Sequence, residues 1–278
     1  MTDFAEHSRA AARHTRIVDA VMTQSLPILM RWPHPNPLCD FLCRPQPQPL
    51  ADKAMVAAKT SVWQRGETAL RLALADPVLP RSVRSDMAEV IGGLVSLRDD
   101  LPRLEEEIAA YLEEFDAQRS EVTNLSDIAD SLRVLRRKLR GKPDSVTGVD
   151  VALAMLEDGA STIYDPRHPY YRTLGMLDRV GPAKTPTDPE DVPDVQAKGI
   201  FGSIGDALSS AADYVLDTAW EDAKGAVVGA GAGALGAWAT GGGSAAGGAV
   251  VGAAAKSGAK VVDDVEDSVK GKGKGKGK

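Results

Sequence analysis

Apolar residues recur at helical spacing through most of the first 180 residues. In residues 101–115 and 128–139 they come every three or four positions, which places them along one face of an α-helix. These positions are Leu101, Leu104, Ile108, Leu112 and Phe115 in the first segment and Ile128, Leu132, Leu135 and Leu139 in the second. A polar break near 120–124 separates the segments, so we expect an antiparallel helical pair.

Opposite charges on the two segments favour this pairing. The acidic residues of the first are Glu105, Glu106, Glu107, Glu113 and Glu114, and the basic residues of the second are Arg133, Arg136, Arg137, Lys138 and Arg140. Each exposed ion pair contributes only ~0.2–1 kcal/mol. A basic helix can also contact phosphate groups, but a solvated face opposite the acidic helix is the favoured interpretation.

Further helices are predicted at 3–26, 52–75, 82–98 and 146–158. Strand signals are almost missing, since no hairpin turn separates alternating β-branched runs. The pattern therefore predicts a mostly α-helical fold, with a helical bundle over residues 1–180.

A proline-rich segment, RWPHPNPLCDFLCRPQPQPL at 31–50, interrupts this pattern. Proline at every second position imposes an extended, polyproline-like backbone. The segment is either an ordered strap across the bundle or a partner-binding loop. Trp32, Leu38, Phe41 and Leu42 would anchor a strap, which is the favoured interpretation.

A change of composition divides the chain. Arginine is absent after Arg179, and residues 181–198 are rich in proline and acid, as in a linker. We expect a separate C-terminal element over 199–270, formed by an amphipathic helix and a Gly/Ala-rich helical hairpin. The Lys/Gly repeat over 271–278 is expected to be disordered.

The Gly/Ala tract at 225–255 carries the strongest functional signal. Its 31 residues contain 11 Gly and 12 Ala and no charge. Glycine recurs every fourth position, which lines small residues along one helix face and lets another backbone approach closely. These helix-packing positions are Gly225, Gly229, Gly233, Gly248 and Gly252. The run Thr240–Ser244 contains three glycines and is the expected break between two arms.

Arm length argues against a permanent two-span anchor. At 1.5 Å per residue the arms 225–239 and 245–255 are ~22 Å and ~17 Å long, whereas a hydrocarbon core is ~30 Å thick. Longer arms would bury Glu221 and Asp222 on one side and Lys256 and Lys260 on the other. Conditional or oligomeric insertion fits better.

The glycine positions resemble the glycine-zipper segments of some bacterial surface antigens, bacteriocin-like peptides and pore-forming proteins. The resemblance covers about the last quarter of the chain and implies that the helices oligomerise in lipid. Trp220 and Trp238 would then lie at membrane interfaces. Lys256, Lys260, Lys270 and Lys272 would contact anionic headgroups.

We therefore expect a non-enzymatic, membrane-associating protein whose hairpin inserts conditionally or oligomerises at a membrane, with permeabilisation as one outcome, while the bundle regulates or recognises. Self-association through the hairpin and a protein partner on the bundle are the expected protein contacts. The main alternative is a structural or adaptor protein whose hairpin packs on its own bundle or on other copies. A third is an effector or virion protein delivered by dedicated machinery.

Motifs for other chemistry are weak. Gly231–Gly236 satisfies GxGxxG, but a dinucleotide loop needs a preceding strand and a following acidic residue, which this context lacks. His34, Cys39 and Cys43 form an incomplete metal-ligand set. Asp165–Tyr171 gathers titratable and aromatic groups, for which a structured turn is the favoured interpretation. We expect no catalytic residue, cofactor or metal.

Charge and cysteine content limit the remaining classes. The net charge of −6 argues against a whole-chain nucleic-acid binder. Two cysteines are too few for a disulfide framework, which favours a reducing compartment. The N-terminal residues lack the apolar region of a secretory signal. We expect a cytoplasmic protein with conditional membrane association.

Overall fold

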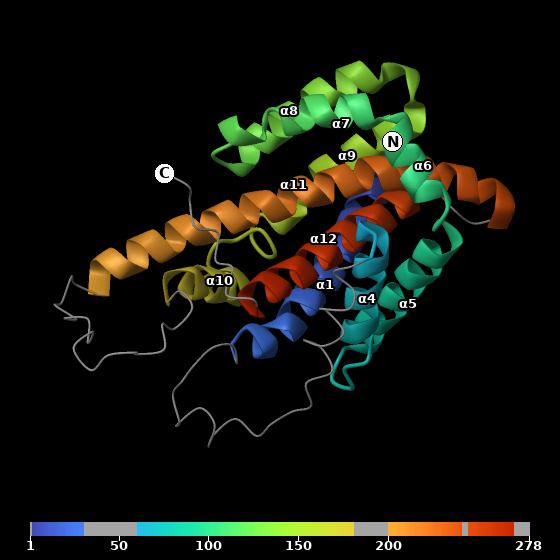
Figure 1. Ribbon diagram of the computed structural model, residues 1–278. Coiled ribbons are helices and arrows are strands. Elements are labelled where there is room, and N and C mark those ends of the chain that lie inside the picture. The colour runs from blue at the N-terminus through green and yellow to red at the C-terminus, as the bar shows by residue number, and fades with distance from the viewer. Residues whose placement is uncertain (1, 31–59, 181–199, 241–243, 270–278) are drawn as a thin grey trace.

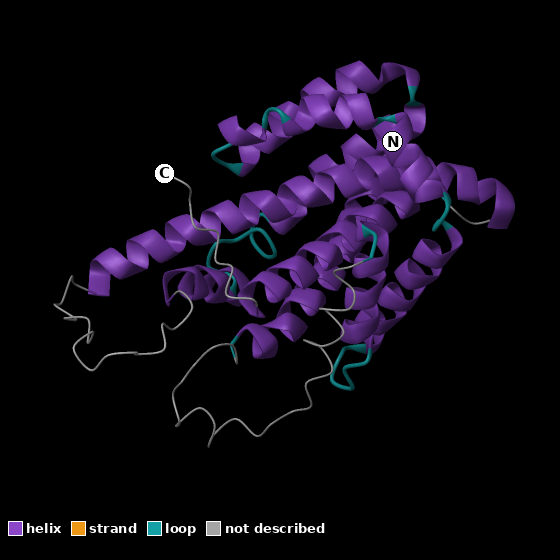
Figure 2. Ribbon diagram, in the orientation of Figure 1, coloured by secondary structure: helices purple, strands orange, loops and turns teal. Residues whose placement is uncertain are grey.

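The computed structural model describes residues 2–30, 60–180, 200–240 and 244–269, and helices are the only regular secondary structure in these ranges (Figure 2). The mostly α-helical fold is therefore confirmed. The helices are α1 (Thr2–Leu29), α4 (Val62–Leu74), α5 (Arg81–Ser96), α6 (Asp100–Glu107), α7 (Ala109–Asp116), α8 (Leu125–Lys138), α9 (Pro143–Gly159), α10 (Pro169–Val180), α11 (Ile200–Thr240) and α12 (Ala245–Val269). Short 3-10 turns, η1 (Arg119–Glu121) and η2 (Leu139–Gly141), follow α7 and α8.

Local sequence explains several helix starts. Ser61 and Gln64 form a capping box at the start of α4, and Asn124 and Asp127 form another at the start of α8. Pro143 occupies the first turn of α9, where its missing N–H costs no helical hydrogen bond. The expected helices at 3–26, 82–98 and 146–158 correspond to α1, α5 and α9. Of the segment expected at 52–75, residues 52–59 lie outside the described ranges, as does the proline-rich segment 31–50.

The segment 101–115 forms two helices instead of one. Ile108 has φ −114° and ψ 9°, which ends α6 and precedes α7. Helix α6 packs on α11, whereas α7 packs on α8. The break at Ile108 thus lets neighbouring turns face different helices.

The pairing of α7 with α8 is present, but most of the expected ion pairs across it are not. Lys138 pairs with Glu114 across the two segments. Arg136 instead pairs with Asp150 of α9 at 2.7 Å. Glu105 pairs with Lys256 of α12 at 2.7 Å.

Helices α11 and α12 form an antiparallel hairpin at the centre of the bundle (Figure 1). Helix α12 also packs on α1, α4, α5 and α9, and α11 packs on α6, α8, α9 and α10. Buried apolar residues from Ala10 to Val265 make one continuous core. The expected bundle and the expected C-terminal element therefore share one core in the described residues. They can do so because the small side chains of the hairpin let the surrounding helices pack closely around it. The linker residues 181–198 lie outside the described ranges.

Candidate functional site: the buried glycine hairpin

The five predicted packing glycines form the contact between the two arms of the hairpin. A Cβ on Gly252 would lie 2.0 Å from the carbonyl oxygen of Gly225, and one on Gly248 would lie 2.2 Å from that of Gly229. A Cβ on Gly233 would lie 2.6 Å from the Cα of Gly248. Any side chain at these positions would overlap the opposite backbone, so only glycine permits this spacing.

Two glycines of the surrounding bundle make similarly close contacts with the hairpin backbone. A Cβ on Gly66 of α4 would lie 2.1 Å from the carbonyl oxygen of Ala255. A Cβ on Gly148 of α9 would lie 2.6 Å from the carbonyl oxygen of Ala226. Helices α4 and α9 therefore approach opposite arms of the hairpin, α12 and α11, as closely as the arms approach each other.

A carboxyl group, Asp222, is buried where the hairpin meets the bundle. Its side chain is 1% exposed. Tyr164 donates a hydrogen bond to Oδ2 at 2.7 Å, and Ser257 of α12 donates another to Oδ1. Burial raises the pKa of Asp222 to about 7, against the opposing effect of the hydrogen bonds from Ser257 and Tyr164.

The imidazole of His14 faces this carboxyl group from α1. Its Nε2 lies 3.5 Å from Asp222 Oδ2, and its side chain is 0% exposed. Neither ring nitrogen has a hydrogen-bond partner among the described residues. Burial lowers the pKa of His14 to about 3, so the ring is neutral at pH 7.

A second buried polar group lies farther along α12. Tyr170 donates a hydrogen bond to Asp264 Oδ2 at 2.6 Å, and Lys260 pairs with the same carboxylate. Burial and the adjacent Asp264 raise the pKa of Tyr170 well above its usual value. The Asp264 carboxylate is therefore neutralised by Lys260, whereas Asp222 accepts hydrogen bonds only from hydroxyl groups in the described part of the chain.

Four ion pairs, which we call the ionic clasp, join the hairpin to the bundle at its periphery. They are Arg65–Asp263 at 3.1 Å, Arg119–Asp217 at 2.7 Å, Asp116–Lys224 at 3.1 Å and Glu105–Lys256 at 2.7 Å. Each pair links α11 or α12 to α4, α6, α7 or η1.

The residues predicted to meet a membrane have other partners in this structure. Trp220 is 2% exposed, stacks on Phe115 with ring centroids 3.8 Å apart, and donates a hydrogen bond from Nε1 to Asp116 at 2.8 Å. Lys256 is buried and lies over the Trp63 ring, 5.0 Å from its centroid. Lys260 lies over the Tyr214 ring. The side chain of Trp238, and Lys270 and Lys272 altogether, lie outside the described residues.

Charged groups are confined to one half of the hairpin. The buried and clasp residues of α11 lie at or before Lys224, and those of α12 at or after Lys256. The half toward the 241–243 connection contains no ionisable side chain. We call these halves the base and the tip. In the described residues, no helix combines the length and apolar character that a membrane span requires.

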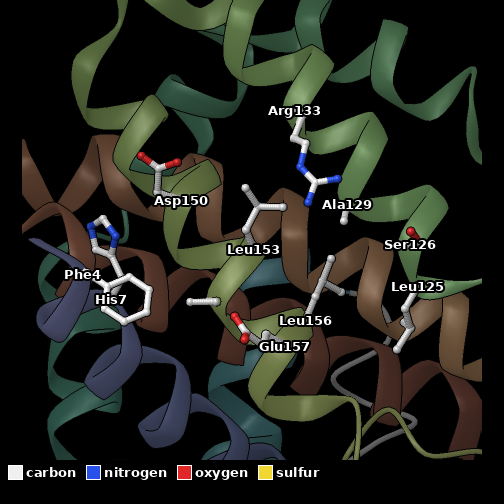
Figure 3. A pocket seen from close by; sticks show the side chains of 11 residues that line it. Phe4, His7, Leu125, Ser126, Ala129, Arg133, Asp150, Leu153, Leu156 and Glu157 are labelled. Carbon is white, nitrogen blue, oxygen red and sulfur yellow. The ribbon is translucent and has the colours of Figure 1, made fainter.

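A separate groove of about 640 Å³ lies on the surface between α1 and α8, over α9 (Figure 3). Phe4, which is 75% exposed, and His7 reach it from α1. Ala129 and Arg133 line it from α8. Its lining is mostly apolar, and the charged residues in it are Arg133, Asp150 and Glu157.

Two of the other sequence motifs lie in regular local structure, one inside a helix and one in a turn. Gly231–Gly236 lies inside α11, with helix before and after it, so the dinucleotide-loop geometry is absent there. Asp165 pairs with Arg167, and His168 lies 3.0 Å from Asp19 Oδ1, in the turn before α10. No group of three or more His, Cys, Asp or Glu that could hold a metal occurs among the described residues, and His34, Cys39 and Cys43 lie outside them.

Sequence reasoning did not single out the buried polar cluster of Asp222, His14, Tyr164 and Ser257. One signal was available, since Asp222 continues the apolar stripe Val215–Ala219 at helical spacing. An acidic residue on an apolar stripe indicates a buried carboxyl group. Its partner His14 lies on a distant part of the chain, where spacing gives no information.

Comparisons with protein-family models, with curated proteins and with solved structures found no match.

Proposed function

We propose that this structure is the closed form of a non-enzymatic, membrane-associating protein, in which the bundle stores the glycine hairpin. The observation that carries the proposal is the uneven distribution of charged side chains along the hairpin. The tip has no ionisable group. The base contains all the clasp residues and all the buried charged residues of α11 and α12. A helix that is apolar on every side belongs either in a protein core or in lipid. The tip has the composition for both environments.

The proposed insertion is partial. Helix α11 beyond Lys224 has 16 residues, or ~24 Å at 1.5 Å per residue, and α12 before Lys256 has 11, or ~17 Å. These lengths enter a ~30 Å hydrocarbon core but do not cross it. The glycine faces would then serve contacts between copies as well as contacts within the hairpin.

Vesicle flotation of the full chain, combined with quenching by lipids brominated on their acyl chains, tests this proposal. We expect the protein to float at low salt, and Trp238→Phe to remove most of the quenching while Trp32→Phe leaves it. Failure to float, or quenching that is independent of Trp238, would contradict insertion of the tip.

A cross-linked variant provides the matched control. A Cβ on Gly231 of α11 would lie 3.8 Å from Oγ of Ser145 on α9 and would meet no backbone atom within that distance. Ser145→Cys with Gly231→Cys, in a background where Cys39 and Cys43 are replaced by Ser, should therefore form a disulfide between tip and bundle. We expect the reduced variant to insert and the oxidised variant not to do so. Equal quenching of both forms would show that the hairpin does not leave the bundle.

A second candidate function is a structural or adaptor protein in which the hairpin remains the core. The close fit of Gly66 and Gly148 to the hairpin backbone favours it, because such contacts hold only while the bundle is closed. In that case the surface groove between α1 and α8 is the site for a protein partner. This candidate predicts no flotation with any lipid.

A further inference from the structure

The ionic clasp surrounds a groove of about 520 Å³ at the base of the hairpin. We call it the clasp groove. Its basic side chains come from both the bundle and the hairpin and are Arg65, Arg119, Lys224, Lys256 and Lys260. Its acidic side chains are Asp116, Asp217, Glu221 and Asp263.

The cations of this groove are largely shielded from solvent. The side chains of Lys256, Lys224 and Arg119 are 8%, 15% and 25% exposed. Although burial acts to lower it, the carboxylates of Glu221 and Asp116 hold the pKa of Lys224 above its usual value. The groove therefore combines five basic side chains, largely shielded from solvent, with the four carboxylates that line it.

Each clasp cation is already held by a carboxylate of the other part of the molecule. Arg119 of η1 binds Asp217 of α11 through both Nε, at 3.1 Å, and Nη2, at 2.7 Å. The phosphodiester of a lipid headgroup offers arginine two non-bridging oxygens and one negative charge, the same recognition chemistry as a carboxylate. A phosphate that takes Arg119 would leave Asp217 without that partner and loosen the base of the hairpin.

We propose that the clasp groove binds the phosphate of anionic lipid headgroups in exchange for the clasp carboxylates, and that this exchange releases the hairpin at a membrane surface. The inference rests on the proposed membrane association and names the surface that triggers it. It assigns Arg119 and the groove lysines to phosphate binding, and Asp217 and Asp116 to the competing closed state.

Replacing Arg119 and replacing Asp217, the two members of one ion pair, should have opposite effects on vesicle binding if the groove binds headgroups. A clasp that only holds the hairpin closed would give the same effect for both. We expect Arg119→Gln to weaken binding to phosphatidylcholine vesicles containing phosphatidylglycerol about five-fold, because each basic residue near an anionic surface contributes about that factor. We expect Asp217→Asn to strengthen binding by a similar factor, because the competing carboxylate is gone. Arg133→Gln, on the exposed face of α8, should change binding little; the Lys/Gly tail is present in every variant.

The full chain and the three variants are compared by flotation with and without phosphatidylglycerol, and their urea midpoints are measured to confirm folding. Stronger binding by both Arg119→Gln and Asp217→Asn would overturn the headgroup site, since it would mean that the clasp only holds the hairpin closed. That result would leave the proposed membrane association intact. If no variant floated with any vesicle, both the headgroup site and the proposed membrane association would be contradicted.

Inorganic phosphate distinguishes the phosphate chemistry from the charge of the lipid surface. The test is made without vesicles through tryptophan fluorescence, because Trp220 lines the groove. At equal ionic strength, phosphate should change this fluorescence more than chloride does, and the difference should disappear in Arg119→Gln. Equal responses to the two anions would contradict a phosphate site.

Discussion

The imidazole Nε2 of His14 lies 3.5 Å from Asp222 Oδ2, and the two side chains are 0% and 1% exposed. Burial shifts their pKa values in opposite directions, to about 3 for His14 and about 7 for Asp222. Between pH ~4 and ~6.5 the folded pair therefore holds one proton, on Asp222. In the unfolded chain, with pKa values of about 3.9 for Asp and about 6.5 for His, the pair also holds one proton, on His14. Since neither state binds more protons, the pair contributes almost no pH dependence to stability over this range.

Asp222→Asn should make the protein acid-sensitive. The variant retains His14, whose pKa is lower in the folded than in the unfolded chain, so the unfolded state binds one proton more between pH ~3 and ~6.5. Relative to the parent chain, the free energy of unfolding should fall by about 1.4 kcal/mol for each pH unit below ~6.5. Urea unfolding at pH 4.5, 5.5 and 6.5 measures this slope, and a slope equal to the parent's would contradict the neutral buried histidine.

His14→Leu should produce the opposite dependence. It retains Asp222, whose pKa is raised by burial, so the folded state binds one proton more between pH ~3.9 and ~7. The stability contribution of Asp222 is fully present below pH ~3.9 and is lost as the pH rises toward ~7, at about 1.4 kcal/mol per unit. The same urea series measures it. The opposite signs of the two slopes are the diagnostic result, because a general loss of packing would shift both variants equally at every pH.

Gly252→Ala should destabilise the protein strongly, because its Cβ would lie 2.0 Å from the carbonyl oxygen of Gly225. Forcing the arms apart should cost at least ~2 kcal/mol. Gly231→Ala on α11 is the matched control, since its Cβ would meet nothing closer than 3.7 Å. Alanine favours a helix over glycine by up to ~1 kcal/mol, so the control should be stabilised. Urea midpoints compare the two, and equal effects would mean that the arms do not approach as described.

Gly148→Ala tests whether the bundle is fitted to the hairpin. Its Cβ would lie 2.6 Å from the carbonyl oxygen of Ala226 and 2.7 Å from the Cα of Val227, so we expect a loss of about 2 kcal/mol. Gly92→Ala on α5, where a Cβ would meet no atom within 4 Å, should be neutral or stabilising. Thermal unfolding of both variants gives the comparison. If Gly148→Ala were as stable as Gly92→Ala, α9 would not contact α11 closely.

Local pattern was sufficient to identify four helices of the bundle. The 3.6-residue recurrence of apolar positions predicted α1, α5, α8 and α9, because helix faces repeat within a few residues of sequence. The break at Ile108 was not predicted, because it depends on α6 and α7 meeting different helices. Four-residue glycine spacing predicted a close helical contact, and the glycine run after Thr240 predicted the end of α11.

By itself, the sequence determined that this chain is helical, that its C-terminal region folds into two arms with a glycine face, and that the tip of the hairpin carries no charge. Only the tertiary structure decided what that face meets. Gly66 and Gly148 lie far from the hairpin in sequence, yet their missing side chains let α4 and α9 reach its backbone. The partners of Asp222 and the clasp residues were likewise decided by packing, because periodicity reports which face of a helix is apolar but not which distant helix covers it.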